Sequence, residues 1–437
     1  MKFVHYDEAR KATTEAISRW MKSDSGVDKA LLVTDLFGKL RLILWSRGDS
    51  VEGARKGLEK QVPENPPWWS GEILLMSGAD EVDRNLWEGA WAEALPDSES
   101  PNLRTLSRHR TRSSWFAKVE EPLWQAPEDG PGIVVFYSFK GGVGRSTTLA
   151  SFAIQRARAG ERVAVIDFDL DAPGIGRLLA ADERGAVSPW GVVDYLVERP
   201  HGEVPLDDYY HGCARVAGKG EILVFPAGTL SEDYPDKLAR VDLEEPPREA
   251  GSPIVSLLQE IKASLAPQWI LLDARTGVSE AAGHLLSGLA HLHVLFGTTS
   301  EQSWQGLRAV IDRLGRQKVL IGKPQAEIVL VQSMVPPSAE AALTARNFFA
   351  DRAREEFTER YYAAAPENAG DPSNEMFWDV RDLDSADAPH APVAITYDQR
   401  LADFRDIAEV ADLLSQYTEH HDVANRILAR FERETEA

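Results

Sequence analysis

Glycine, hydroxyl and basic side chains gather in residues 138–148, which read SFKGGVGRSTT. The run follows a β-branched and aromatic segment, residues 133–137, that predicts a buried strand, and it leads into a helix-compatible segment ending before Gly160. Glycines allow backbone N–H groups to turn toward an anion, and a helix N-terminus adds unsatisfied donors and partial positive charge. Residues 138–148 therefore predict a phosphate-binding loop and a nucleotide ligand.

Carboxylates stand at the ends of two further predicted strands. Residues 162–166 form an apolar run that leads to Asp167 and Asp169, which alternation places on one side of the chain. Another apolar run, residues 269–272, ends in Asp273. Carboxylates at the carboxyl ends of strands, beside a phosphate loop, suit Mg²⁺ and water better than a core. Asp171 is expected to serve in a turn or as a helix cap.

The loop resembles the deviant Walker A loop of the ParA/MinD family of dimerising ATPases, in the SIMIBI class of P-loop NTPases. The resemblance rests on Lys140-Gly-Gly-x-Gly, and the sequence is identified as a member of a bacterial variant branch that carries KGGVGR. Phe139 stands where the usual pattern has glycine, and Arg145 where it has lysine. Arginine keeps the charge but replaces a compact ammonium by a planar fork, so binding with hydrolysis and binding without it stay as alternatives.

The resemblance implies ATP and Mg²⁺ as cofactors and gives the motif residues roles. Lys140 and Asp169 would be catalytic: Lys140 reaches the partner's nucleotide across a dimer, and Asp169 orients the attacking water. Gln332 falls where an adenine-contacting asparagine is common. The implied metal site comprises Ser146, Asp167 and Asp273. The implied phosphate contacts are Lys140, Gly141, Gly142, Val143, Gly144, Arg145, Ser146 and Thr147.

Arg275 departs from the family pattern, which has a small proline-containing segment after the position of Asp273. This second cation has two interpretations: it assists catalysis near the γ-phosphate, or it pairs with an acid. The strand and helix alternation continues to a closing strand at residues 393–397, so the resemblance spans about residues 130–417. It implies an α/β fold, a P-loop NTPase with a mostly parallel, doubly wound sheet.

The N-terminal region predicts a separate small α+β domain. A hairpin of residues 30–34 and 40–45 is joined by helical patterns at 51–61 and 83–95 and by a strand at 72–76. The predicted domain limits are residues 1–125 for a partner or adaptor domain, 126–132 for a linker, 133–417 for the ATPase, and 418–437 for a C-terminal helix packed on it.

Composition limits the surroundings and partners of the protein. The chain has 437 residues, a net charge of −21 and a single cysteine, which excludes an internal disulfide and a cysteine-cluster metal site. Residues 1–125 hold 18 Lys+Arg and 20 Asp+Glu, a charge of −2, which leaves −19 for the rest. Such an acidic ATPase disfavours DNA. No run approaches the roughly 18 apolar residues of a membrane span, and the start lacks a signal-peptide core, so a cytoplasmic protein without membrane attachment is predicted.

A basic island interrupts the acidic sequence, with no acid between residues 101 and 117. It can serve nucleic acid, the phosphates of a nucleotide, or the acidic ATPase domain, and it is the one place where nucleic-acid binding is expected. Its members are Arg104, Arg108, His109, Arg110 and Arg112.

Two functions follow from the motifs. The first is a slow Mg-dependent ATPase that acts as a nucleotide-driven homodimerisation switch and signals to a protein partner through its N-terminal domain. A bacterial defence or conflict system is its setting only by analogy with the KGGVGR branch. The alternative is an ATP-binding scaffold or regulator with little or no hydrolysis. A tyrosine kinase with related motifs is disfavoured, because Tyr417 is the only tyrosine after Tyr397.

Overall fold

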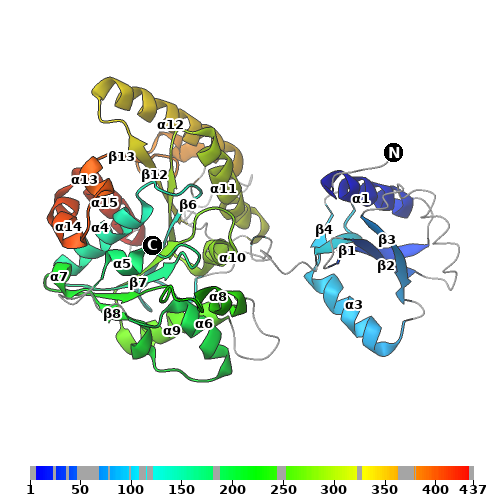
Figure 1. Ribbon diagram of the computed structural model, residues 1–437. Coiled ribbons are helices and arrows are strands. Elements are labelled where there is room, and N and C mark those ends of the chain that lie inside the picture. The colour runs from blue at the N-terminus through cyan, green and yellow to red at the C-terminus, as the bar shows by residue number, and fades with distance from the viewer. Residues whose placement is uncertain are drawn as a thin grey trace. The chain divides into compact units, whose positions relative to one another are not determined.

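The computed structural model divides the chain into two compact units, Met1–Ser113 and Ser114–Ala437 (Figure 1). The division falls before the predicted boundary at residue 125, and Trp124 and Ala126 are buried in the core of the second unit. The predicted domain limits remain a proposal. The structure describes residues 6–22, 26–35, 39–46, 68–76, 79–97, 100–107, 115, 122–180, 188–243, 252–321, 327–362, 378 and 380–432.

The N-terminal unit is an α+β arrangement built on one mixed sheet. Within its described residues, the sheet has the order β3-β2-β1-β5-β4. The predicted hairpin is confirmed, since β1 and β2 pair in antiparallel register from Thr34 opposite Leu40 to Ala30 opposite Leu44. The predicted helix at 51–61 lies outside the described residues. The elements are α1 (Tyr6–Lys22), β1 (Val27–Thr34), β2 (Leu40–Ser46), β3 (Trp69–Leu75), α3 (Glu81–Glu93), β4 (Leu95–Pro96) and β5 (Leu103–Ser107).

The second unit alternates strands and helices along most of its length. Short 3₁₀ or π segments lie at Arg199–His201, Leu206–Tyr209, Leu285–Leu289 and Val380–Asp384. The longer elements are β6 (Gly132–Ser138), α4 (Arg145–Arg158), β7 (Arg162–Phe168), α5 (Ile175–Leu178), α6 (Val192–Glu198), β8 (His211–Gly212), α7 (Ala214–Ala217), β9 (Glu221–Phe225), α8 (Tyr234–Arg240), α9 (Pro253–Leu265), β10 (Trp269–Ala274), α10 (Glu280–His284), β11 (Leu292–Gly297), α11 (Glu301–Ile321), β12 (Glu327–Val335), α12 (Ala339–Arg360), β13 (Val393–Thr396), α13 (Gln399–Ala402), α14 (Ile407–Gln416) and α15 (Thr418–Glu432).

The sheet of this unit confirms the predicted fold class. Its described strands run β13-β12-β11-β6-β10-β7-β9-β8, and every neighbouring pair is parallel except β8 with β9. β6 is buried at all its positions because helices cover both faces of a parallel sheet, which explains its continuous apolar sequence. The order places β6 between β10 and β11, with β7 beyond β10, so the predicted loop and the predicted carboxylates meet at one edge of the sheet.

The C-terminal helix α15 packs into the core of the same unit. Val423, Ile427 and Phe431 are buried, and the Phe431 ring meets Trp269 edge to face at a centroid distance of 4.9 Å. α15 also lies against α14 and α4, the helix that follows the glycine loop. Among the described residues, no helix is both long and apolar enough to cross a bilayer.

Candidate nucleotide-binding site

The glycine loop connects β6 to α4 and leaves its backbone open. Gly142 and Gly144 have φ values of 72° and 79°, in the left-handed region that glycine adopts without strain. A Cβ placed on Gly141, Gly142 or Gly144 would meet nothing within 4 Å. Lys140 is exposed, whereas Val143 is buried beneath the loop. Because α4 begins directly after Gly144, its first N–H groups add to an anion-binding surface.

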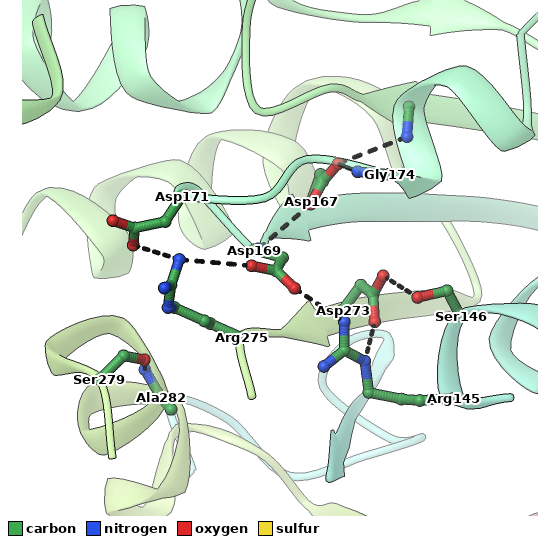
Figure 2. Close-up of polar contacts among 11 residues, drawn as sticks. Arg145, Ser146, Asp167, Asp169, Asp171, Gly174, Asp273, Arg275, Ser279 and Ala282 are labelled. Carbon is green, nitrogen blue, oxygen red and sulfur yellow. Dashed lines mark hydrogen bonds and ion pairs between the residues drawn. The ribbon is translucent and has the colours of Figure 1, made fainter. Parts of the chain in front are cut away.

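Arg145 turns toward two carboxylates at the ends of neighbouring strands. Its Nε donates to Oδ1 of Asp273 at 2.6 Å, and Nη2 donates to Oδ2 of Asp169 at 3.1 Å (Figure 2). Burial disfavours the charge on this guanidinium, but Asp273 and Asp169 outweigh burial and raise its pKa. Nη1 is buried and has no hydrogen-bond partner among the described residues. The implied phosphate contact of Arg145 therefore rests on Nη1, since the other two nitrogens hold carboxylates.

Asp273 joins the start of α4 to the end of β10. Its Oδ2 accepts a hydrogen bond from Ser146 Oγ at 2.7 Å, so the two predicted metal-binding residues are in direct contact. In the sheet, Asp273 stands opposite Asp167 of β7 and Phe136 of β6. Burial raises the pKa of Asp273, and the nearby Arg145 opposes that rise.

Asp167 is held by the backbone of its own loop. Oδ1 accepts from the N–H of Asp169 at 3.1 Å, and Oδ2 accepts from the N–H groups of Gly174 at 3.0 Å and Gly176 at 3.5 Å. Burial, and then the charge of Asp273, raise the pKa of Asp167 to about 8, although these backbone bonds act in the opposite direction. The carboxylate that organises this turn is thus Asp167, although the sequence assigned turn or cap chemistry to Asp171.

Asp171 and Arg275 form an ion pair at the outer side of Asp169. Arg275 Nη1 lies 2.6 Å from Asp171 Oδ2 and 3.7 Å from Asp169 Oδ1. Of the two interpretations left open for Arg275, the contacts are those of pairing with an acid. Figure 2 shows the resulting row of side chains, from Asp171 through Arg275, Asp169 and Arg145 to Asp273.

The remaining predicted residues lie around the row without joining it. Gln332 is buried within β12, opposite Gly297 at the end of β11, and its Nε2 donates to the carbonyl of Ala345 at 2.9 Å. Gln332 Oε1 is buried without a hydrogen-bond partner among the described residues. Thr147 is half-buried in the first turn of α4. The roles assigned to these residues stay predictions.

Two positioning contacts were not foreseen from the sequence. Phe139 packs against Gly306 of α11 so closely that a Cβ on this glycine would lie 1.8 Å from Phe139 Cγ. Trp115 donates from Nε1 to the carbonyl of Ser279 at 2.6 Å, in the segment that follows Asp273 and Arg275. The sequence did indicate that Phe139 needs a packing partner, because an aromatic ring occupies a position where the usual pattern has glycine. Nothing in the sequence identified Gly306 as that partner.

The side chains fit a Mg²⁺ ion that is completed by phosphate and water. No group of three or more histidine, cysteine or acidic residues capable of holding a metal occurs in the described part of the chain. A nucleotide-associated Mg²⁺ needs only one or two carboxylates besides phosphate oxygens and water. The contact between Ser146 Oγ and Asp273 Oδ2 places a hydroxyl and a carboxylate oxygen beside the loop.

A model of the CobQ/CobB/MinD/ParA nucleotide binding domain matches residues 134–435, more than half of the chain. The chain belongs to this family. The matched region contains the loop, the acidic strand ends and the whole row of charged side chains described above. The predicted ParA/MinD resemblance is therefore confirmed, and the chain carries a nucleotide-binding domain.

Curated proteins similar to this chain include an iron-sulfur cluster carrier protein and an Fe-S cluster assembly factor. The iron-sulfur cluster carrier protein of Salmonella typhimurium is 39% identical over 259 residues, which cover 53% of this chain and 62% of the relative. A cytosolic Fe-S cluster assembly factor NUBP2 homolog of Trichoplax adhaerens is 35% identical over 66 residues, 15% of this chain and 25% of the relative. The chain thus spans less than two thirds of the length of either relative.

A solved structure of septum site-determining protein MinD from Pyrococcus horikoshii, complexed with Mg-ADP, is also similar. It shares 16% sequence identity, with 50% of this chain and 77% of that chain covered and a TM-score of 0.36.

Proposed function

We propose that this protein is a Mg-dependent ATPase that works as a nucleotide-driven dimerisation switch and signals to a protein partner in the cytoplasm. One observation carries the proposal. Arg145 and Ser146, directly after the open glycine loop, donate hydrogen bonds to the buried acidic cluster at Asp273. A loop alone supports nucleotide binding. Carboxylates beside it supply the metal site and the water-orienting group that hydrolysis requires.

Each side chain then has a defined part in the reaction. The oxygen of a water molecule attacks the γ-phosphorus, the bond to the β,γ-bridging oxygen breaks, and Asp169 accepts a water proton. Ser146 and Asp273, with Asp167 behind them, would hold a Mg²⁺ ion, which would supply positive charge to the phosphate oxygens. Gln332 contacts the base. The phosphates are bound by Lys140 of the partner copy and by Gly141, Gly142, Val143, Gly144, Arg145 Nη1, Ser146 and Thr147.

The proposed signal leaves the site through the segment after Asp273. Trp115, at the start of the second unit, bonds Ser279 in that segment, and Arg313 donates to the carbonyl of Trp115. A rearrangement around Arg275 would thus reach Trp115, within the second unit. The N-terminal unit as the partner-binding part is a proposal from the sequence, and a setting in a bacterial defence system rests on the KGGVGR resemblance alone.

Nucleic acid is a weaker candidate for the partner. Arg104, the described member of the basic island, donates to the carbonyl of Trp91 at 2.8 Å and lies 4.7 Å from the centre of its ring. Arg108 to Arg112 lie outside the described residues. An iron-sulfur cargo is disfavoured as well, because the sequence has one cysteine, Cys213, which is buried and whose pKa burial raises to about 11.

The second candidate function is an ATP-binding scaffold with little hydrolysis. It is favoured by the contact of Arg145 with Asp169, because a carboxylate that holds a guanidinium is less able to take a proton from water. ATP and GTP hydrolysis by the purified protein with Mg²⁺ separates the two functions. We expect slow ATP turnover that falls at least about tenfold in Asp169→Ala, with nucleotide binding largely retained. Absent turnover in the wild-type protein would favour the scaffold.

The switch itself is tested by the oligomeric state. Lys140 is exposed, and in the proposed dimer it would contact the triphosphate of the partner copy. Size exclusion with light scattering, run with ATP in Asp169→Ala, should show a dimer that Lys140→Ala abolishes while a labelled nucleotide still binds. A dimer of equal stability without nucleotide, or one indifferent to Lys140, would contradict the switch.

A further inference from the structure

The two oxygens of Asp169 have different surroundings. Oδ2 accepts a hydrogen bond from Arg145 Nη2 at 3.1 Å. Oδ1 is buried and has no hydrogen-bond partner among the described residues, although Arg275 Nη1 lies 3.7 Å away. That distance gives electrostatic attraction but exceeds a hydrogen bond. Oδ1 is thus the oxygen of Asp169 that makes no hydrogen bond among the described residues, and a cation faces it.

Arg275 is held in this place by an acid of its own. Asp171 Oδ2 lies 2.6 Å from Arg275 Nη1, whereas Asp169 Oδ1 is more than 1 Å farther from the same nitrogen. Asp169 and Asp171 follow β7, and Arg275 follows β10, so the pair connects the ends of two adjacent parallel strands. Figure 2 shows Arg275 reaching from the β10 side toward both carboxylates.

We propose that Arg275 is a positioning residue for hydrolysis: anchored by Asp171, it fixes the Asp169 carboxylate so that Oδ1 faces the attacking water. Arg145 holds one oxygen of Asp169 and Arg275 attracts the other, which leaves the carboxylate a single orientation. A water-orienting group works only within a narrow range of positions, so a loose carboxylate would lose rate without losing nucleotide. The inference rests on the proposed hydrolysis and adds a residue to it.

The exposure of the pair argues against a mainly structural role. The side chains of Arg275 and Asp171 are 31% and 51% exposed, and ion pairs in such positions contribute little to folding. A matched control exists in the same unit, where Arg215 Nη1 lies 2.7 Å from Asp406 Oδ2 with side-chain exposures of 41% and 40%. Arg215 lies outside the row of charged side chains at the site.

Steady-state ATP hydrolysis with Mg²⁺ by the full-length protein tests the inference. Arg275→Ala should lower kcat about tenfold with KM for ATP unchanged, Asp171→Ala should lower it about threefold, and Arg275→Lys should restore much of the loss. Arg215→Ala should match the wild type. In the Asp169→Ala background, Arg275→Ala should cause no further loss, because its effect passes through Asp169.

The outcomes separate this inference from the function on which it rests. A raised KM or weaker labelled-nucleotide binding in Arg275→Ala, in both backgrounds, would make Arg275 a direct nucleotide ligand and overturn the positioning role. A normal tenfold loss in Asp169→Ala together with unchanged kcat in Arg275→Ala would overturn the inference alone. No turnover in the wild type, or wild-type turnover in Asp169→Ala, would overturn the proposed hydrolysis and the inference with it.

Discussion

The acidic row at the strand ends and the cluster around Glu356 both bury carboxylates among arginines, but they balance charge differently. Glu356 of α12 is 5% exposed. Its Oε1 lies 2.5 Å from Nε of Arg308 and 3.2 Å from Nε of Arg352. Its Oε2 lies 2.9 Å from Nε of Arg360. Both oxygens of Glu356 are therefore held by guanidinium groups of the protein itself, and the same arginines also pair with Glu301, Glu355 and Glu359. Nothing further is needed to complete this cluster, and its effect is to join α11 to α12.

The row at the strand ends keeps an excess of negative charge. Asp273 and Asp169 share Arg145, and the buried Asp167 accepts backbone N–H groups and has no cationic partner among the described residues. Burial, and then the charge of a neighbouring carboxylate, raise the pKa of both Asp167 and Asp273. This difference in charge balance is the one expected between a structural cluster and a ligand-binding one, and it supports the function proposed for the row.

The largest expected effect comes from removing charge at the incomplete cluster. Asp273→Asn keeps the shape but loses the negative charge that faces Arg145 and the proposed metal site, so ATP turnover should fall by roughly a hundredfold. Asp412→Asn, at an ion-paired acid that is 81% exposed, is the control and should keep wild-type turnover. Steady-state hydrolysis after confirming folding by thermal melting measures both. Near-normal turnover in Asp273→Asn would show that the row at the strand ends does not serve ATP hydrolysis.

A buried titratable group outside both clusters supplies the pH test. Burial lowers the pKa of His293 in β11 from 6.5 to about 4. Between these values the unfolded chain binds more protons, so stability is full above pH 6.5 and falls as the pH drops toward 4, by up to about 3 kcal/mol. His293→Leu should flatten this dependence in urea unfolding curves and leave turnover at neutral pH unchanged. His420, whose pKa burial also lowers to about 4, should retain part of the slope.

The loop and the three strands that position the site could be predicted from the sequence, because each motif is local. The strands predicted at 133–137, 162–166 and 269–272 are β6, β7 and β10, each extended by one or two residues at one or both ends. Parallel topology then brings their carboxyl ends together whatever the side chains between them. The meeting of the loop with Asp167, Asp169 and Asp273 follows from that geometry.

The partners within the site could not be predicted, because they depend on distances between segments far apart in the chain. Arg145 was assigned to phosphate from its motif position, yet two of its nitrogens hold Asp169 and Asp273. The pairing of Arg275 with Asp171 depends on the β7 and β10 register. Residues 126–132 were predicted to be a linker from their proline and glycine content, which is typical of turns as well, and residues 126–129 form a turn.

Removing charge at the cluster around Glu356 should lower the stability of the protein and leave its ATP turnover unchanged. Glu356→Gln leaves the surrounding guanidinium groups without their buried acid, and we expect a loss of about 2 kcal/mol in the free energy of unfolding. The figure is modest because these arginine side chains are 25–32% exposed and can be rehydrated. Chemical denaturation measures it, with Glu359→Gln, at a 68% exposed side chain, as the control. Lost turnover per folded molecule would show that Glu356 also serves the site.

The smallest expected effect concerns the packing of Phe139 against Gly306. This contact can determine the position of the glycine loop independently of either charge cluster. Gly306→Ala places a methyl group 1.8 Å from Phe139 Cγ, so the ring beside Lys140 must move. Such overpacking costs about 1 kcal/mol, which corresponds to roughly fivefold weaker nucleotide binding if the strain is released on the loop. Adding Phe139→Ala removes the ring and should restore most of the affinity, in a double-mutant cycle read by titration of a labelled nucleotide. If the losses of the two single variants simply add, the loop position does not depend on the contact between Phe139 and Gly306, and the charges at Arg145 alone would set it.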